Sequence, residues 1–287
     1  MQNLNFLMNF IVFGFFPESE RWRLILILCI VLSNGWLILE YARDKIHTRT
    51  VTLCSIALLL MSWVLAFGDG WLFIQLSHDQ LSGLILNICL VYWSLPIATL
   101  FSMGSCYMAI YHPQLWPVRF FEGLCKIIRS IPLISLLFFM TLILPMMTHL
   151  TLTRFDAALF SFVIFVMAYV IEVFKGAYNA IDQHQHESAH ALGIAGWQKY
   201  SHIDLPQIMK NSIPSLMNTY IGVFKDTTLV MMIGLSDSLG NLQLLISKNE
   251  YRHDFIALFA LIGLLFWALC WLWGVFGRKL EEGLIHE

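Results

Sequence analysis

Long apolar stretches are the feature that most limits what this chain can fold into. They fall at residues 22–40, 51–67, 84–111, 131–149, 157–174, 213–235 and 255–276. Each holds about 20 residues, enough for an α-helix to cross a bilayer, where only a helix satisfies its own backbone hydrogen bonds. Because 58% of the residues are apolar and 13% are charged, the chain cannot hide this surface from water. We therefore predict an all-α integral membrane protein with a helix at each stretch.

The opening segment, residues 1–21, is apolar but is interrupted by Gly14 and Pro17. Both residue types disfavour a continuous helix, so we expect this segment to lie in the extracytoplasmic membrane interface or against a neighbouring element. We expect no cleavable signal, because Arg21 and Arg23 follow the first apolar stretch instead of preceding it.

The distribution of lysine and arginine predicts the orientation, because basic loops remain in the cytoplasm. One set of loops, with the tail at 277–287, contains Arg43, Lys45, Arg49, Arg119, Lys126, Arg129, Lys175, Lys199, Lys210, Arg278 and Lys279. The opposite set contains only Arg21, Arg23, Arg154, Lys248 and Arg252. We therefore predict that the N-terminus is outside, and that the C-terminus and the long polar loop at 175–212 are cytoplasmic.

Charge and motifs exclude two kinds of ligand. The formal net charge is -2 and the basic residues are spread thinly, whereas nucleic-acid binding needs a concentrated basic surface. The sequence contains no GK[ST] phosphate-binding loop, so we expect neither an ATP site nor any other cofactor in this chain.

The stretch HESAHALG, residues 186–193, permits two interpretations. His186, Glu187 and His190 form an HExxH pattern, which in zinc proteases supplies two metal ligands and a general base. A zinc site also needs a third ligand, and no nearby residue has a spacing that specifies one. The second interpretation is a short docking helix, because Ala189, Leu192, Gly193 and Gly196 recur at helical spacing and would form one small, apolar face.

The second interpretation accounts for more of the chain. Glu187, Ser188 and Ala189, followed by Gly193 and then by Leu205 with Pro206, resemble the EAA loop of ATP-binding-cassette (ABC) importer permeases. The stretches IIRSIPLISLLFF at 127–139 and FKDTTLVMMIGLSDSLG at 224–240 are similar to segments of the polar amino-acid branch of that family. Ser188, Ser130 and Lys126 depart from the family pattern, and such subunits usually carry one more N-terminal span.

The resemblance implies a type I importer core of five transmembrane helices at 84–276, preceded by two accessory transmembrane helices at 22–83. It also implies a non-catalytic permease of the bacterial inner membrane that imports polar amino acids. The expected partners are ABC ATPase subunits that bind ATP and magnesium, a second permease subunit, an extracytoplasmic solute-binding protein and membrane lipid. The implied ATPase-coupling residues are Glu187, Ser188, Ala189, Leu192, Gly193, Leu205 and Pro206.

Charged and hydroxyl side chains within the expected spans are candidates for the translocation path. A lone charge in a span costs at least about 2.5 kcal/mol, so such a residue should face protein or a watery path. The candidates are Lys225, Asp226, Thr227, Thr228 and Glu172, which could instead form a buried polar brace. Two other functions remain open from the sequence: a zinc-dependent membrane protease, and a secondary transporter that needs no ATPase.

Overall fold

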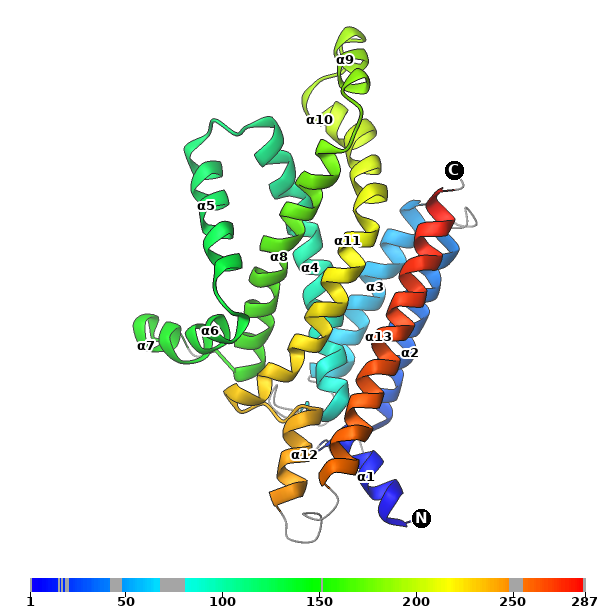
Figure 1. The fold of residues 1–287 in the computed structure, drawn as a ribbon, viewed down its shortest axis with the longest axis vertical. Helices are drawn as coiled ribbons and strands as arrows, with labels where there is room; N and C mark the ends of the chain where they lie inside the picture. Colours follow the sequence, from blue (N-terminus) through cyan, green and yellow to red (C-terminus); the bar gives the residue numbers. More distant parts are fainter. Residues whose placement is uncertain are drawn as a thin grey trace.

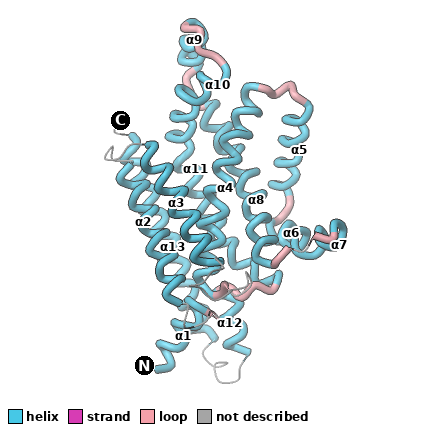
Figure 2. The backbone as a smooth tube through the Cα atoms, turned by 180° about the vertical axis from the view of Figure 1, so that it is seen from behind, coloured by secondary structure: helices cyan, strands magenta, loops and turns pink. Residues whose placement is uncertain are grey.

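A computed structural model of the chain describes residues 2–14, 16, 18, 21–41, 48–67, 81–150, 152–247 and 255–285. Within these ranges the regular elements are all helical, as the sequence predicts, and no β-strand occurs (Figure 2). The α-helices are α1 (Gln2–Phe13), α2 (Arg21–Tyr41), α3 (Thr48–Phe67), α4 (Gly83–Tyr111), α5 (Trp116–Ser130), α6 (Leu133–Phe138), α7 (Leu144–Thr148), α8 (Arg154–Asn179), α9 (Gln183–Ala191), α10 (Gly196–Lys199), α11 (Leu205–Asp226), α12 (Ser238–Ser247) and α13 (Phe255–Ile285). Two π-helical segments (Phe139–Ile143 and Tyr200–Asp204) and one 3₁₀ segment (Thr227–Ile233) connect some of them.

The long helices stand side by side in one bundle, with α2, α3 and α13 grouped on one flank and α5 on the other (Figure 1). Within the described ranges, α2, α4, α8 and α13 are each long and apolar enough to cross a membrane. The apolar part of α3, Leu53–Ala66, is shorter. The loop that carries α9 protrudes at one end of the bundle, whereas α1 and α12 lie at the other (Figure 1).

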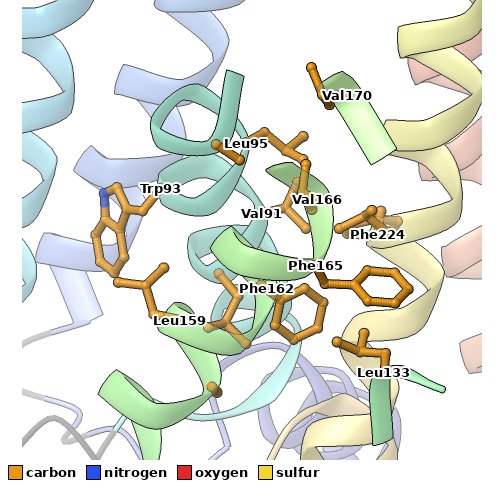
Figure 3. Close-up of a cluster of buried hydrophobic side chains, with 14 of the residues drawn as sticks. Val91, Trp93, Leu95, Leu133, Leu159, Phe162, Phe165, Val166, Val170 and Phe224 are labelled. Carbon is orange, nitrogen blue, oxygen red and sulfur yellow. The ribbon is translucent and has the colours of Figure 1, made fainter. Parts of the chain in front are cut away.

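The centre of the bundle is the contact between α4 and α8. Val91 and Leu95 of α4 lie beside Phe162 and Val166 of α8 (Figure 3). The indole of Trp93 is buried against α3, where its Nε1 donates to Ser62 Oγ at 2.9 Å. Between membrane-spanning helices, close van der Waals packing and interhelical hydrogen bonds stabilise such a contact, so α4 and α8 form the scaffold on which the loops are held.

The helical stretch expected at 131–149 is present as α6, the segment Phe139–Ile143 and α7, but its direction was not predicted. The chain bends by 111° between α5 and the α6–α7 segment, and α6 and α7 project sideways from the bundle (Figure 1). Ile131 and Pro132 have extended backbone angles between the two helices. Proline disfavours a helical conformation in the residue before it, which explains why the helix breaks here.

The expected span at 213–235 also differs from the structure. Helix α11 begins at Leu205 and ends at Asp226, after which the chain continues as the 3₁₀ segment. Pro206 lies in the first turn of α11, where the missing N–H removes no helical hydrogen bond, so it is compatible with the start of this helix.

Helix α1, in the opening segment, packs against α4 and α12 of its own chain. Two glycines permit this contact. Gly14 and Gly83 have φ values of +56° and +71°, and a Cβ atom on Gly83 would lie 2.4 Å from the carbonyl oxygen of Val12. Only glycine adopts this conformation readily and leaves space for the neighbouring backbone. Pro17 lies outside the described residues.

Candidate coupling site

Helix α9 is a short helix that is capped at both ends. At its start, the side chain of Asp182 accepts a hydrogen bond from the backbone N–H of His184 at 3.0 Å. At its end, Gly193 has φ +74°, and the N–H of Ile194 donates to the carbonyl of Ala189 at 3.0 Å. Both are standard ways of satisfying terminal backbone groups, so α9 has defined ends although it is only nine residues long.

The predicted single apolar face of this loop is wrong. Ala189 is 3% exposed and faces the protein, whereas the side chain of Leu192 is 76% exposed and points away from it. The helix stops at Ala191, so the spacing that would align the two residues does not continue. A Cβ atom on Gly193 would meet no atom within 4 Å. The outward surface of the loop is therefore formed by Leu192, Gly193 and the exposed Trp197.

The remaining coupling candidates are divided between this surface and the base of the loop. Glu187 and Ser188 are exposed on α9, and Glu187 Oε1 accepts from Gln183 Nε2 at 3.2 Å. Leu205 is partly buried against the main core, and Pro206 is exposed on the first turn of α11.

The HExxH residues do not form a metal site. His190 is exposed, whereas His186 turns inward, with its Nδ1 2.8 Å from Lys199 Nζ and 3.5 Å from Asp204 Oδ1. A catalytic zinc site needs three protein ligands in one place. In the part of the chain that the structure describes, no group of three or more His, Cys, Asp or Glu side chains is arranged to hold a metal.

The base of the loop contains a buried polar cluster that the sequence analysis missed. We call Tyr111, His186, Lys199 and Asp204 the loop-base cluster. Lys199 Nζ donates to Asp204 Oδ2 and to Tyr111 Oη, both at 3.3 Å, and Tyr111 Oη donates to Asp204 Oδ2. Asp204 is completely buried and Lys199 is 9% exposed, so neither charge is solvated and each depends on these contacts.

Aromatic side chains enclose the loop-base cluster. Tyr178 of α8 lies with its ring 5.0 Å from that of His186, and Tyr107 of α4 lies 5.1 Å from Tyr200. Tyr200 Oη donates to the carbonyl of Met103 at 2.6 Å, and burial raises the pKa of this phenol above its ordinary value. Two opposite charges five residues apart, Lys199 and Asp204, were the only signal in the sequence; their partner Tyr111 is too distant along the chain to be inferred.

The candidates for the translocation path do not converge on one site. Lys225 and Asp226 are the last two residues of α11, and Lys225 is exposed. Glu172 instead pairs with Arg129 at 3.1 Å. The Arg154 guanidinium, at the start of α8, donates to the carbonyl of Gly234, which directly follows the 3₁₀ segment. Glu172 lies roughly 27 Å further along α8, at a rise of 1.5 Å per residue. Glu172 and the end of α11 are therefore at different levels of the bundle.

Thr227 belongs to a second buried polar cluster, at the opposite end of the bundle from α9. Asn87 Nδ2 donates to Thr227 Oγ1 at 2.9 Å and to Asp237 Oδ2 at 3.2 Å, and Asn87 Oδ1 accepts from the hydroxyl of Ser238. Burial raises the pKa of Asp237, and hydrogen bonds from the Gly240 N–H and from Asn87 oppose this shift. Thr227 is thus a brace between α4 and the segment before α12, whereas Thr228 donates to the Lys225 carbonyl one turn earlier.

A cavity of about 230 Å³ lies between α4, α5 and α8. Two ion pairs across it join α5 to α8: Lys175 Nζ lies 2.6 Å from Glu122 Oε1, and Arg129 pairs with Glu172. These pairs hold α5 beside α8 although the two helices separate toward the α9 end of the bundle (Figure 1).

Comparison with known proteins agrees with this architecture. The family model described as "Binding-protein-dependent transport system inner membrane component" matches residues 102–286. The inner membrane amino-acid ABC transporter permease protein YhdY of Escherichia coli (strain K12) is 28% identical over 282 residues, which cover 94% of this chain and 74% of that protein. The glutamate/glutamine/aspartate/asparagine transport system permease protein BztC of Rhodobacter capsulatus is 34% identical over 177 residues, 61% of this chain and 38% of that protein.

The fold is also similar to a solved structure. The crystal structure of an amino acid ABC transporter with histidines superposes with a TM-score of 0.62, covering 70% of this chain and 91% of that chain at 22% identity. Neither the family nor the fold supports the zinc-protease or secondary-transporter alternatives. The chain therefore belongs to the family of binding-protein-dependent transport system inner membrane components, the non-catalytic permease subunits of ABC importers.

Proposed function

We propose that this permease imports polar amino acids and that α9 transmits the movement of an ABC ATPase to the bundle. The observation that carries the coupling role is the position of α9, which protrudes from one end of the bundle on a capped loop with Leu192 and Trp197 uncovered (Figure 1). Exposed apolar side chains on a protruding loop offer contact area to a partner protein. The transport of amino acids by the two relatives named above supports amino acids as the substrate class.

The partners follow from this role. ATP and magnesium bind to the ATPase subunits, which approach the α9 end of the bundle from the cytoplasm. The solute-binding protein approaches the opposite end, near α1 and α12, so the N-terminus is outside and the C-terminus is inside. A second permease, either another copy or a sister subunit, completes the pathway, and lipid surrounds the apolar outer faces.

Within this proposal, the exposed coupling residues are Glu187, Ser188, Leu192, Gly193 and Pro206, while Ala189 and Leu205 support the loop from beneath. Among the path candidates, Lys225 is exposed, and Asp226 and Thr228 are partly exposed. Thr227 and Glu172 act on the path indirectly, through the groups that they bind.

Gly193 provides a test of the docking surface. Gly193→Trp places an indole on the outward surface of the loop, where the chain itself leaves space, so we expect loss of ATPase association and of uptake with normal membrane insertion. Because φ is +74° here, a large side chain such as tryptophan adds about 1–2 kcal/mol of backbone strain. Gly193→Asn is the matched control, since asparagine tolerates this conformation and is small. The measurements are co-purification of the ATPase and uptake of radiolabelled amino acid into proteoliposomes. Normal uptake by Gly193→Trp would contradict docking at this surface.

A further inference from the structure

The loop-base cluster joins four separate parts of the chain at one point. Tyr111 is the last residue of α4, His186 belongs to α9, Lys199 ends α10, and Asp204 ends the π-helical segment before α11. Tyr178, near the end of α8, adds its ring: Lys199 Nζ lies 5.9 Å from the centre of that ring and 5.5 Å from that of Tyr111. The base of the protruding loop is thus attached to the ends of the two helices that form the core.

The chemistry of this attachment makes it stiff. A buried ion pair with several hydrogen bonds holds its partners in one geometry, because each alternative arrangement leaves a charge without solvent or partner. Asp204 Oδ2 receives hydrogen bonds from Lys199 and Tyr111, which lie on opposite sides of the junction between loop and bundle. Asp204 also ends a π-helical turn, a local distortion that is frequent at functional sites.

We propose that Lys199, Asp204 and Tyr111 are positioning residues that transmit movement of the α9 loop to α4 and α11. This inference rests on the proposed function, because it assumes that an ATPase grips the loop. The exposed residues of α9 receive the force, and the loop-base cluster passes it to the spans. Without the cluster, the loop bends independently, so the ATPase still docks and hydrolyses ATP but uptake no longer follows each cycle.

The deciding variant is Tyr111→Phe, which removes only the hydroxyl that bridges α4 to Asp204 and keeps the aromatic ring. Asp204→Asn is the second variant, because it keeps the shape of the side chain and removes its charge. Tyr107→Phe is the matched control. Tyr107 lies one turn earlier on α4 and stacks 5.2 Å from Tyr111, and its hydroxyl makes no hydrogen bond to the described residues.

The experiment uses the complete complex of permeases, ATPase and solute-binding protein in proteoliposomes, and measures amino acid imported per ATP hydrolysed. We expect this ratio to fall by about fivefold or more in Tyr111→Phe and Asp204→Asn, the size of effect that is typical when coupling between two sites in a protein is lost. In Tyr107→Phe we expect the ratio to stay unchanged. ATPase co-purification should remain normal in all three. A merely structural role would lower the amount of assembled complex and leave the ratio unchanged.

Two negative outcomes are distinguishable. An unchanged ratio in the Tyr111→Phe complex overturns the transmission role of the cluster, and leaves import by this chain intact. Absence of ATP-dependent uptake with the unmodified chain overturns the proposed function, and the transmission role with it. If Asp204→Asn does not assemble, Tyr111→Phe alone decides, because its ring still packs against Tyr107 and Tyr200.

Discussion

Leu192 shows how the role proposed for a single residue depends on its structural surroundings. This leucine lies on a polar loop, and 76% of its surface is exposed. Its position is nevertheless fixed, because Leu192 N–H donates to the Ser188 carbonyl at 3.1 Å and Gly193 ends the helix directly after it. An apolar side chain that is held in place but left uncovered is well suited to fill a pocket on a partner.

This gives a prediction at the residue scale. Leu192→Glu places a carboxylate where an apolar contact is expected, and should weaken ATPase association by about 2 kcal/mol or more, roughly thirtyfold in affinity. Gln198→Glu, another exposed position of the same loop, is the control for added charge and should have little effect. Titration of purified ATPase against the permease in nanodiscs measures both. Equal weakening by the two variants would argue for a general charge effect instead of a leucine-specific pocket.

At the scale of elements, the junction between α1 and α4 shows how a backbone contact depends on one residue type. Gly83 begins α4 with φ +71°, its N–H donates to the Ser236 carbonyl at 2.8 Å, and the Val12 carbonyl occupies the space of a missing Cβ. Three segments far apart in sequence therefore meet at a residue without a side chain.

Gly83→Ala should lower the thermal stability of the purified subunit. The added methyl group imposes about 1–2 kcal/mol of strain and must also displace the backbone of α1. Gly104→Ala is the matched control on the same helix, because a Cβ atom there meets nothing within 4 Å and helical alanine is favoured over glycine by up to about 1 kcal/mol. Melting curves in detergent compare the two. A melting temperature for Gly83→Ala that equals that of Gly104→Ala would show that the close contact contributes nothing.

The sequence predicts helices well where apolar composition alone determines them. It predicts poorly the direction of the chain after a break, and contacts between residues far apart in the sequence. Apolar length identified α4, α8 and α13, and the EAA pattern located α9. Hydropathy does not report the direction of the chain, so the bend at Pro132 was missed. The two polar clusters were missed for another reason: Asn87 and Asp237 are 150 residues apart, and no local spacing brings them together.

At the scale of the whole molecule, the sequence lacks the motif that an ATP-driven motor would need. It has no phosphate-binding loop, and its family consists of permease subunits that work with an ATPase. An isolated copy should therefore insert in the membrane but be unable to concentrate a solute.

We expect proteoliposomes that contain this permease alone to show no uphill amino-acid uptake, and addition of the ATPase, the binding protein and any sister permease to restore it. A sodium or proton gradient applied without ATP serves as the control, because a secondary transporter would respond to it. Radiolabelled amino-acid accumulation is the measurement. Accumulation driven by an ion gradient alone would be incompatible with the proposed mechanism.

Helix α4 has a restraint at each end. Asn87 ties one end to Thr227 and Asp237, and Tyr111 ties the other end to Asp204, roughly 36 Å away along the axis. Because both attachments point sideways from the helix, turning α4 about its own axis would break hydrogen bonds at the two extremities together. Rotation of α4 about its axis is therefore opposed at both ends, and a tilt is the movement that these hydrogen bonds oppose least.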